Sequence, residues 1–152
     1  MTKCLVMFSG GLDSTIAVHL LKKQGLEVKA LHFVLPFYTG IGSQYNGIRE
    51  ATERLGVELR IIEEAEEFLP MVKNPAFGYG KNANPCLDCR IHRLTKAKMI
   101  MEEEGAAFLA TGEVVGQRPM SQRMDCLHKI VKQAGLRGLS AKRVWVKATS
   151  PQ

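Results

Sequence analysis

The sequence predicts an α/β fold with three layers, in which helices cover both faces of a mostly parallel sheet of about five strands. Short apolar runs without polar alternation, which are typical of strands buried on both faces, take turns with segments of helical periodicity. Such an alternation of strands and helices forms parallel sheets through right-handed crossovers. With 152 residues the chain suits one domain around one core, so we expect residues 1–152 to form a single domain.

The expected elements follow one another in a regular order. A buried strand, Cys4–Phe8, leads through a glycine loop into a helix from Asp13 to Gln24, which Gly25 ends. This helix is expected to bury the face formed by Ile16, Ala17, Leu20 and Leu21. Further strands are expected at residues 28–34, 57–62, 106–111 and 143–146, and further helices at 43–55, 87–104 and 120–134. The acidic residues 63–67 are interpreted as a solvated helix start.

Composition restricts the class of protein. Hydrophobic residues make up 45% and charged residues 24%, which is typical of a soluble globular chain. No apolar run approaches the roughly 20 residues of a membrane helix, and the apolar start is too short for a secretory signal, so we expect a cytoplasmic protein without a membrane partner. In that reducing compartment the four cysteines should be free, metal-bound or redox-active.

The net charge of +6 is unevenly distributed along the chain. Residues 1–89 carry 9 Lys and Arg against 10 Asp and Glu, whereas residues 90–152 carry 12 against 5. Such an asymmetry indicates an anionic partner, and nucleic acid is the first candidate because Lys and Arg contacts to phosphate supply most of its binding energy. From charge alone, a solvated basic surface without a partner is equally compatible.

The loop between the first strand and the first helix suits a phosphate-bearing ligand. It reads Ser9-Gly10-Gly11-Leu12-Asp13-Ser14. The glycines bring backbone N–H groups close to an anion, the serines add hydroxyl donors, and the helix N-terminus adds partial positive charge. Asp13 beside a polyanion implies Mg²⁺ held by one carboxylate and phosphate oxygens. The loop lacks the Gly-Lys-Ser/Thr ending of a Walker P-loop, which argues against γ-phosphate transfer.

On this hexapeptide, placed between a buried strand and a helix, the chain resembles the N-type ATP pyrophosphatases. The resemblance covers nearly the whole chain in element order and implies a Rossmann-like, adenine nucleotide α-hydrolase-like fold. It implies that a substrate oxygen attacks the α-phosphate of ATP while the loop holds pyrophosphate and Mg²⁺. In the family, the backbone after the second strand binds adenine, which here implies Leu31, His32 and Phe33. Because no RNA-binding domain is added at either end, we expect an incomplete or minimal member that needs a partner.

Two further segments are similar to parts of tRNA thiolation enzymes. Residues Ala110–Glu113, followed by Gly116-Gln117, are similar to a loop of tRNA 4-thiouridine synthetases. That match implies that Thr111, Gly112 and Gln117 contact the nucleotide. Residues 84–89 read Asn-Pro-Cys-Leu-Asp-Cys and are similar to the Asn-Pro-x-x-x-Cys segment of tRNA 2-thiouridylases, in which the final cysteine carries sulfur.

The second match makes Cys89 the catalytic candidate, with Cys86 as its partner. Both are expected at a helix N-terminus beside Arg90, where the dipole and neighbouring cations lower the pKa of a thiol, so we expect reactive thiols. A persulfide on Cys89 resolved by Cys86 and an iron–sulfur cluster with Cys126 as third ligand both stay open. Zinc ranks below them, because Cys4 and Cys126 lack a paired spacing.

The leading hypothesis is an ATP-dependent tRNA sulfurtransferase whose partners are ATP, tRNA and a sulfur-donor protein or sulfide. The basic residues expected to flank its site and bind RNA are Arg90, Arg93, Lys96, Arg118 and Arg123. An adenylating ligase or amidotransferase partner on the same fold is a second hypothesis, and a nucleotide-binding module without turnover is a third. Trp145 is assigned to the core or to a homodimer contact.

Overall fold

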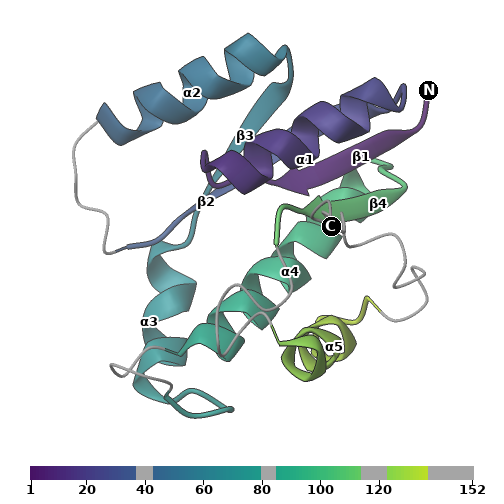
Figure 1. The fold of residues 1–152 in the computed structure, drawn as a ribbon. Coiled ribbons are helices and arrows are strands. Elements are labelled where there is room, and N and C mark those ends of the chain that lie inside the picture. The colour runs from purple at the N-terminus through teal and green to yellow at the C-terminus, as the bar shows by residue number, and fades with distance from the viewer. Residues whose placement is uncertain (37–42, 80–84, 114–122, 137–152) are drawn as a thin grey trace.

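A computed structural model describes residues 1–36, 43–79, 85–113 and 123–136 of the chain. The strands are β1 (Lys3–Met7), β2 (Glu27–Val34), β3 (Glu58–Glu63) and β4 (Phe108–Thr111). The helices are α1 (Leu12–Lys23), α2 (Ser43–Leu55), α3 (Ala65–Lys73), α4 (Cys86–Glu103) and α5 (Met124–Gln133). Figure 1 shows α1 and α2 together on one side of the sheet, with α4 and α5 on the other.

The four strands form one parallel sheet in the order β3-β2-β1-β4. The chain builds outward from β1 to β3 and then crosses back through α3 and α4, so that β4 pairs with the free side of β1. Met7 at the end of β1 pairs with Leu31 of β2 and with Thr111 of β4. The strand order therefore reverses beside β1, which is where ligands of such sheets bind.

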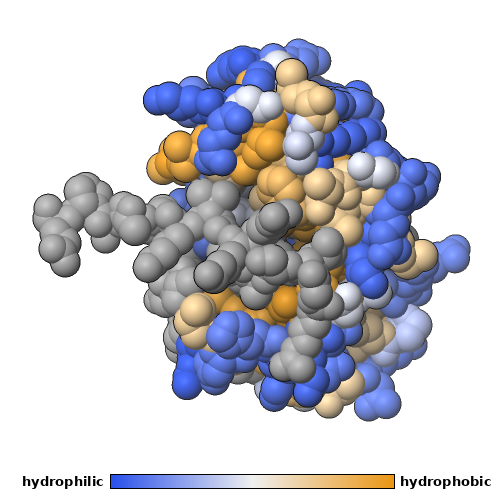
Figure 2. All heavy atoms as spheres, turned by 90° about the vertical axis from the view of Figure 1, so that its right-hand side faces the viewer, coloured by the Kyte–Doolittle hydropathy of each residue, from blue (hydrophilic) through white to orange (hydrophobic). Residues whose placement is uncertain are grey.

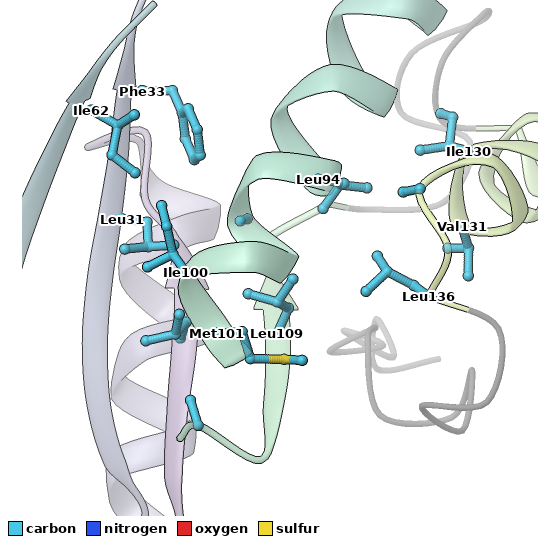
Figure 3. Close-up of a cluster of buried hydrophobic side chains, with 14 residues drawn as sticks. Leu31, Phe33, Ile62, Leu94, Ile100, Met101, Leu109, Ile130, Val131 and Leu136 are labelled. Atoms are coloured by element: carbon cyan, nitrogen blue, oxygen red, sulfur yellow. The ribbon is translucent and has the colours of Figure 1, made fainter. Parts of the chain in front are cut away.

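Alternate residues of β1 enter two hydrophobic cores, one on each face of the sheet. Leu5 belongs to the first core. Figure 3 shows Leu31 of β2, Leu94 of α4 and Ile130 of α5 in the same core. Val6 packs in the second core against α1 and α2. A leucine buried this completely contributes about 1.5–3 kcal/mol to folding. The unbroken apolar run of β1 thus reflects burial on both faces, and the expected three-layer α/β/α fold is confirmed.

Several local expectations were wrong. The buried face of α1 consists of Ser14, Ala17, Val18 and Leu21, whereas Ile16 is exposed and Leu20 lies at the margin. The helix start expected at the acidic residues 63–67 is confirmed, since α3 begins there and contains Pro70, but Glu64 is buried rather than solvated. Helix α4 begins at Cys86, one residue earlier than expected. Helix α5 begins at Met124, and the expected strand at residues 143–146, with Trp145, lies outside the described residues.

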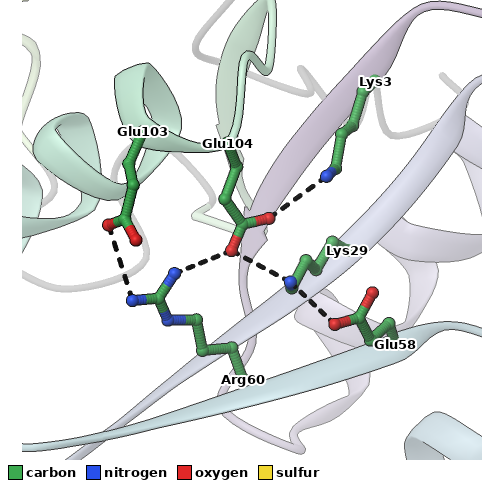
Figure 4. A network of polar contacts seen from close by, with 6 residues as sticks. All are labelled: Lys3, Lys29, Glu58, Arg60, Glu103 and Glu104. Atoms are coloured by element: carbon green, nitrogen blue, oxygen red, sulfur yellow. Dashed lines mark hydrogen bonds and ion pairs between the residues drawn. The ribbon is translucent and has the colours of Figure 1, made fainter.

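An ionic network closes the sheet at the amino ends of its strands. The Glu104 carboxylate, at the end of α4, lies 2.8 Å from Arg60 Nη1, 2.9 Å from Lys29 Nζ and 3.2 Å from Lys3 Nζ (Figure 4). Although burial opposes the charged form, hydrogen bonds from these cations lower the pKa of Glu104 to about 2. One carboxylate thereby joins α4 to three neighbouring strands, at the opposite end of the sheet from the glycine loop.

The surface is mixed in character. Seen from the side of α5 and β4, hydrophilic residues form most of the outline and hydrophobic ones gather towards the middle of the face (Figure 2). None of the helices in the described part of the chain has the length and hydrophobicity needed to span a bilayer.

Candidate functional site

The glycine loop after β1 is held by its own serines. Ser14 Oγ donates to the Gly11 carbonyl at 3.0 Å, and the backbone N–H of Ser9 donates to Ser14 Oγ at 3.3 Å. The two serine hydroxyls lie 3.2 Å apart. Gly10 has a φ of 81°, and a Cβ there would lie 3.2 Å from Ile48 of α2. A non-glycine residue at Gly10 would therefore suffer both backbone strain and a tight contact.

The start of α1 has the features of an anion site. Gly11 is its N-cap, and among the described residues no side chain caps the first turn. The N–H groups of that turn consequently keep their capacity to bind an anion. Asp13 lies in this turn and lines the adjoining pocket. A single carboxylate there fits Mg²⁺, which is commonly bound by one or two carboxylates together with phosphate oxygens.

The end of β4 presses directly against this loop. A Cβ on Gly112 would lie 2.6 Å from the carbonyl carbon of Asp13 and 2.6 Å from the backbone nitrogen of Ser14. Real Cβ atoms do not approach backbone so closely, so only glycine allows the two loops to meet. The two segments that sequence similarity singled out are therefore in contact.

A pocket of about 590 Å³ opens at the carboxyl ends of the strands. It is lined by residues from β1, α1, β2, α2, α4 and β4. The sequence-predicted members are Ser9, Asp13, Ser14, Leu31, His32, Phe33, Arg90, Arg93, Thr111 and Gly112. Tyr45 and Ile48 of α2 also line the pocket and were not predicted for the site. Gln117 and Arg118 lie outside the described residues.

Two polar side chains in this pocket have distinct roles. His32 Nδ1 donates to the Phe8 carbonyl at 2.8 Å, which fixes its ring against the end of β1, and its role in adenine binding stays a prediction. Thr111 is buried, and in the described part of the chain its hydroxyl has no hydrogen-bond partner. An unpartnered hydroxyl at a pocket wall favours a polar ligand, because a buried hydroxyl left unpaired is costly.

The basic residues predicted to bind RNA already have acidic neighbours. Arg90 forms an ion pair with Glu113, and Arg93 Nε lies 3.6 Å from Glu64 Oε2. Lys96 pairs with Glu67 at 2.9 Å and Arg123 with Asp125 at 3.3 Å. Arg90 and Arg93 line the nucleotide-sized pocket, so the structure places them beside the glycine loop. Their contact with RNA stays a prediction.

The two cysteines of the Cys-x-x-Cys segment differ in their surroundings. Cys86, the first residue of α4, is exposed, whereas Cys89 is half-buried one turn later. Burial raises the pKa of the Cys89 thiol, and the Glu64 carboxylate raises it further, against the opposing effect of Arg93 and Arg90. The expectation that helix position and cations lower this pKa was wrong for Cys89, because desolvation outweighs the two arginines.

The third cysteine does not join the pair. Cys126 lies in the first turn of α5, and the described residues contain no group of three or more His, Cys, Asp or Glu side chains able to hold a metal. The residues present thus do not fit the three-cysteine iron–sulfur cluster that the sequence left open.

Glu64 is the site residue that sequence reasoning missed. It follows β3, is fully buried, and its two carboxylate oxygens have no hydrogen-bond partner among the described residues. His92 Nε2 lies 3.2 Å from it. Burial raises the pKa of Glu64, opposed by His92 and Arg93. In the sequence, a run of glutamates does not indicate which of them is buried. The only indication of a partner is the basic residue Arg93, four residues after Cys89 on α4.

A match to a known protein family identifies the family of this chain. The family described as tRNA methyl transferase HUP domain matches residues 2–134. The chain belongs to this family. The matched range includes every described residue of the pocket and both cysteines of the pair. Membership of the HUP-domain family therefore rests on the whole αβα unit rather than on the glycine loop alone.

The relatives of this HUP domain include tRNA thiolation enzymes, which confirms the resemblance drawn from the sequence. A tRNA-specific 2-thiouridylase from Sulfurimonas denitrificans is 33% identical over 118 residues, covering 74% of this chain and 35% of its own. The structure of a 4-thiouridine synthetase in complex with RNA and ATP superposes with a TM-score of 0.74 at 24% identity, covering 98% of this chain and 37% of that one. Because the sequence identity is only 24%, this similarity shows that the two chains share a fold and shows no more than that.

A second solved structure shares the fold. It is a U34-tRNA thiolase from Methanococcus maripaludis with its 4Fe-4S cluster, at a TM-score of 0.61 and 22% identity, covering 96% of this chain and 51% of that one. The HUP domain described here spans about a third of the length of the curated relatives it matches. What those longer proteins do as a whole is consequently a proposal for this chain.

Proposed function

We propose that this chain is the ATP-dependent activating unit of a tRNA sulfurtransferase, which adenylates a tRNA base and inserts sulfur through Cys89. The observation that carries the proposal is a single pocket that joins the glycine loop, the ends of β2 and β4, and two arginines of α4. The same helix begins with the Cys86–Cys89 pair. The position of the arginines and the cysteines on adjoining turns of α4 supports coupling of nucleotide activation to sulfur chemistry.

The first step is adenylation of the base. The carbonyl oxygen of the base attacks the α-phosphorus of ATP, the bond between the α-phosphorus and its bridging oxygen breaks, and pyrophosphate leaves. The uncapped first turn of α1 and the hydroxyls of Ser9 and Ser14 support binding of the leaving pyrophosphate. Asp13 would hold Mg²⁺, which neutralises charge on the phosphates. Leu31 and Phe33 supply apolar walls for adenine.

The second step is sulfur insertion. Cys89 receives a sulfane sulfur from a donor persulfide, and the donor leaves as a thiol. The terminal sulfur of the Cys89 persulfide attacks the activated carbon of the base, and AMP leaves with the oxygen. Cys86, three residues away and on the same side of the first turn, attacks Cys89 Sγ, which releases the thiolated base and leaves a Cys86–Cys89 disulfide. A dithiol reductant then restores both thiols.

The ATP half of the proposal is tested by Asp13→Asn, which keeps the side-chain shape and removes its charge. Titration of ATP with and without Mg²⁺ should show that Mg²⁺ strengthens binding to the native chain and has little effect on the variant. Native chain with tRNA should release AMP and pyrophosphate. ADP and phosphate as main products would contradict the proposal, and steady pyrophosphate release would exclude a module without turnover.

The sulfur half is tested by Cys89→Ser, with Cys126→Ser as the matched control on a neighbouring helix. Mass spectrometry of bulk tRNA nucleosides from cells carrying each variant should show loss of a thionucleoside for Cys89→Ser only. ATP affinity should be unchanged, because Cys89 does not line the pocket. Undiminished thiolation in Cys89→Ser would refute the assigned role, and formation of an amide product with ammonia would favour the ligase alternative.

A further inference from the structure

The segment between α3 and α4 presents two aromatic side chains to solvent. Phe77 is 39% exposed and Tyr79 is 53% exposed, within a run of small and polar residues that begins at Asn74. An aromatic side chain that stays exposed forgoes the free energy gained by burying its apolar surface, unless a partner covers it. Neither residue lines the nucleotide pocket, so the adenylation site does not explain their exposure.

This segment is held in place rather than loosely connected. The carboxylate of Asp88, a buried residue of α4, accepts from the backbone N–H of Ala76 at 2.9 Å and from that of Phe77 at 3.2 Å. The hydroxyl of Tyr79 lies within hydrogen-bonding distance of the carbonyls of Val72 and Lys73 at the end of α3. Both aromatic residues are therefore positioned before any ligand arrives, which lowers the entropic cost of binding.

A cation accompanies the aromatic rings. Lys129 of α5 places its Nζ 5.3 Å from the centroid of the Phe77 ring. Single-stranded nucleic acid is bound by this combination, because a base stacks on an aromatic face while a nearby cation attracts the phosphate. The C-terminal part of the chain from residue 90, to which Lys129 belongs, carries 12 basic against 5 acidic residues, which complements a polyanion.

The position of the segment relates it to the cysteines. Asp88, which holds Ala76 and Phe77, lies between Cys86 and Cys89 in the first turn of α4. Figure 1 shows the segment after α3 beside that end of α4 and beside α5. A base stacked here would consequently lie next to the sulfur-carrying pair.

We propose that residues 74–79, the aromatic segment, form a stacking platform for an unpaired nucleotide of the RNA substrate. The inference rests on the proposed function, because it presumes that the chain acts on tRNA. Stacking tolerates any base, so the platform contributes affinity and places the strand beside Cys86 without reading sequence.

The test compares Phe77→Leu, which removes the π-face and keeps an apolar side chain, with Phe77→Trp, which enlarges it. Affinity for tRNA, measured by fluorescence anisotropy at low salt, should fall about 5- to 100-fold in Phe77→Leu and be kept or raised in Phe77→Trp. The control Met99→Ala alters an exposed apolar residue near the C-terminal end of α4 and should leave affinity unchanged. ATP affinity, measured in parallel, should be equal in all four proteins and reports correct folding.

The possible outcomes separate the platform from the proposed function. Native affinity in Phe77→Leu, with native ATP binding, would overturn the platform alone. A native chain without measurable tRNA affinity would overturn both proposals. If Phe77→Leu changes the oligomeric state and not the RNA affinity, the aromatic segment is a contact between protein chains and the platform is wrong.

Discussion

Glu104→Gln should destabilise the chain by up to about 3 kcal/mol at pH 7. The side chain is 11% exposed and touches three cations, so solvent screens it little. Its pKa falls from 4.5 to about 2 on folding, and at about 1.4 kcal/mol for each pKa unit this corresponds to roughly 3 kcal/mol. Glutamine keeps the shape and one acceptor oxygen, so the loss measured is mainly that of the charge.

The sign of the pH dependence follows from the lowered pKa. Because the folded state binds the proton of Glu104 less readily than the unfolded state, its contribution is fully present above pH 4.5 and disappears as the pH falls towards 2. Urea unfolding should show the same difference between native chain and variant at pH 7 and pH 5, and a smaller difference at pH 3. Glu103→Gln, on an exposed carboxylate 3.6 Å from Arg60, is the control and should cost under about 1 kcal/mol. A constant difference at all three pH values would refute the reasoning.

Three further changes test other parts of the molecule. Gly112→Ala should weaken ATP binding and cost about 1–3 kcal/mol, because its Cβ would overlap the backbone of Asp13; native ATP titrations and native urea unfolding would contradict this. Glu64→Gln should gain stability relative to the native chain as the pH rises from 4.5 to 8, because burial raises the pKa of Glu64 and the native carboxylate is increasingly disfavoured; unfolding curves at both pH values decide it. Arg123→Ala should lower the log–log salt slope of tRNA binding by roughly 0.7–0.9, and an unchanged slope would remove Arg123 from the interface.

The fold could be predicted because its signals are local and repeated. β1 is apolar at every position since both of its faces are buried, and the glycines that end α1 and α2 mark their boundaries. The buried face of α1 was misjudged because Ser14 turns inward to hold the loop, which moves the buried stripe by one residue. A helix start was expected at the acidic residues after β3, but the length of α3 was not, because Pro70 and the glutamates do not show a helical stripe of apolar residues.

The candidate site could be predicted at positions where the backbone accepts only one type of residue. Gly10, with its positive φ, and Gly112, with backbone at contact distance, allow no other side chain, so their motifs point to a definite place. The state of the Cys89 thiol could not be predicted, because it depends on burial and on Glu64, which is 25 residues away in sequence. Long-range electrostatics of this kind leave no pattern along the chain.

The ion pairs of Arg90 and Arg93 have a consequence for which anions the pocket can hold. Each arginine already faces a carboxyl group of the protein, Glu113 or Glu64, so these two cations have partners before a ligand binds. An incoming phosphate must compete with these carboxylates, and every arginine that turns to it leaves a negative group behind. A singly charged anion gains little from such an exchange. Under the proposed function, a chain of phosphates with its own divalent cation would bring charge of both signs to these side chains, and the pocket would thereby favour a nucleoside triphosphate over the abundant small anions of a cell.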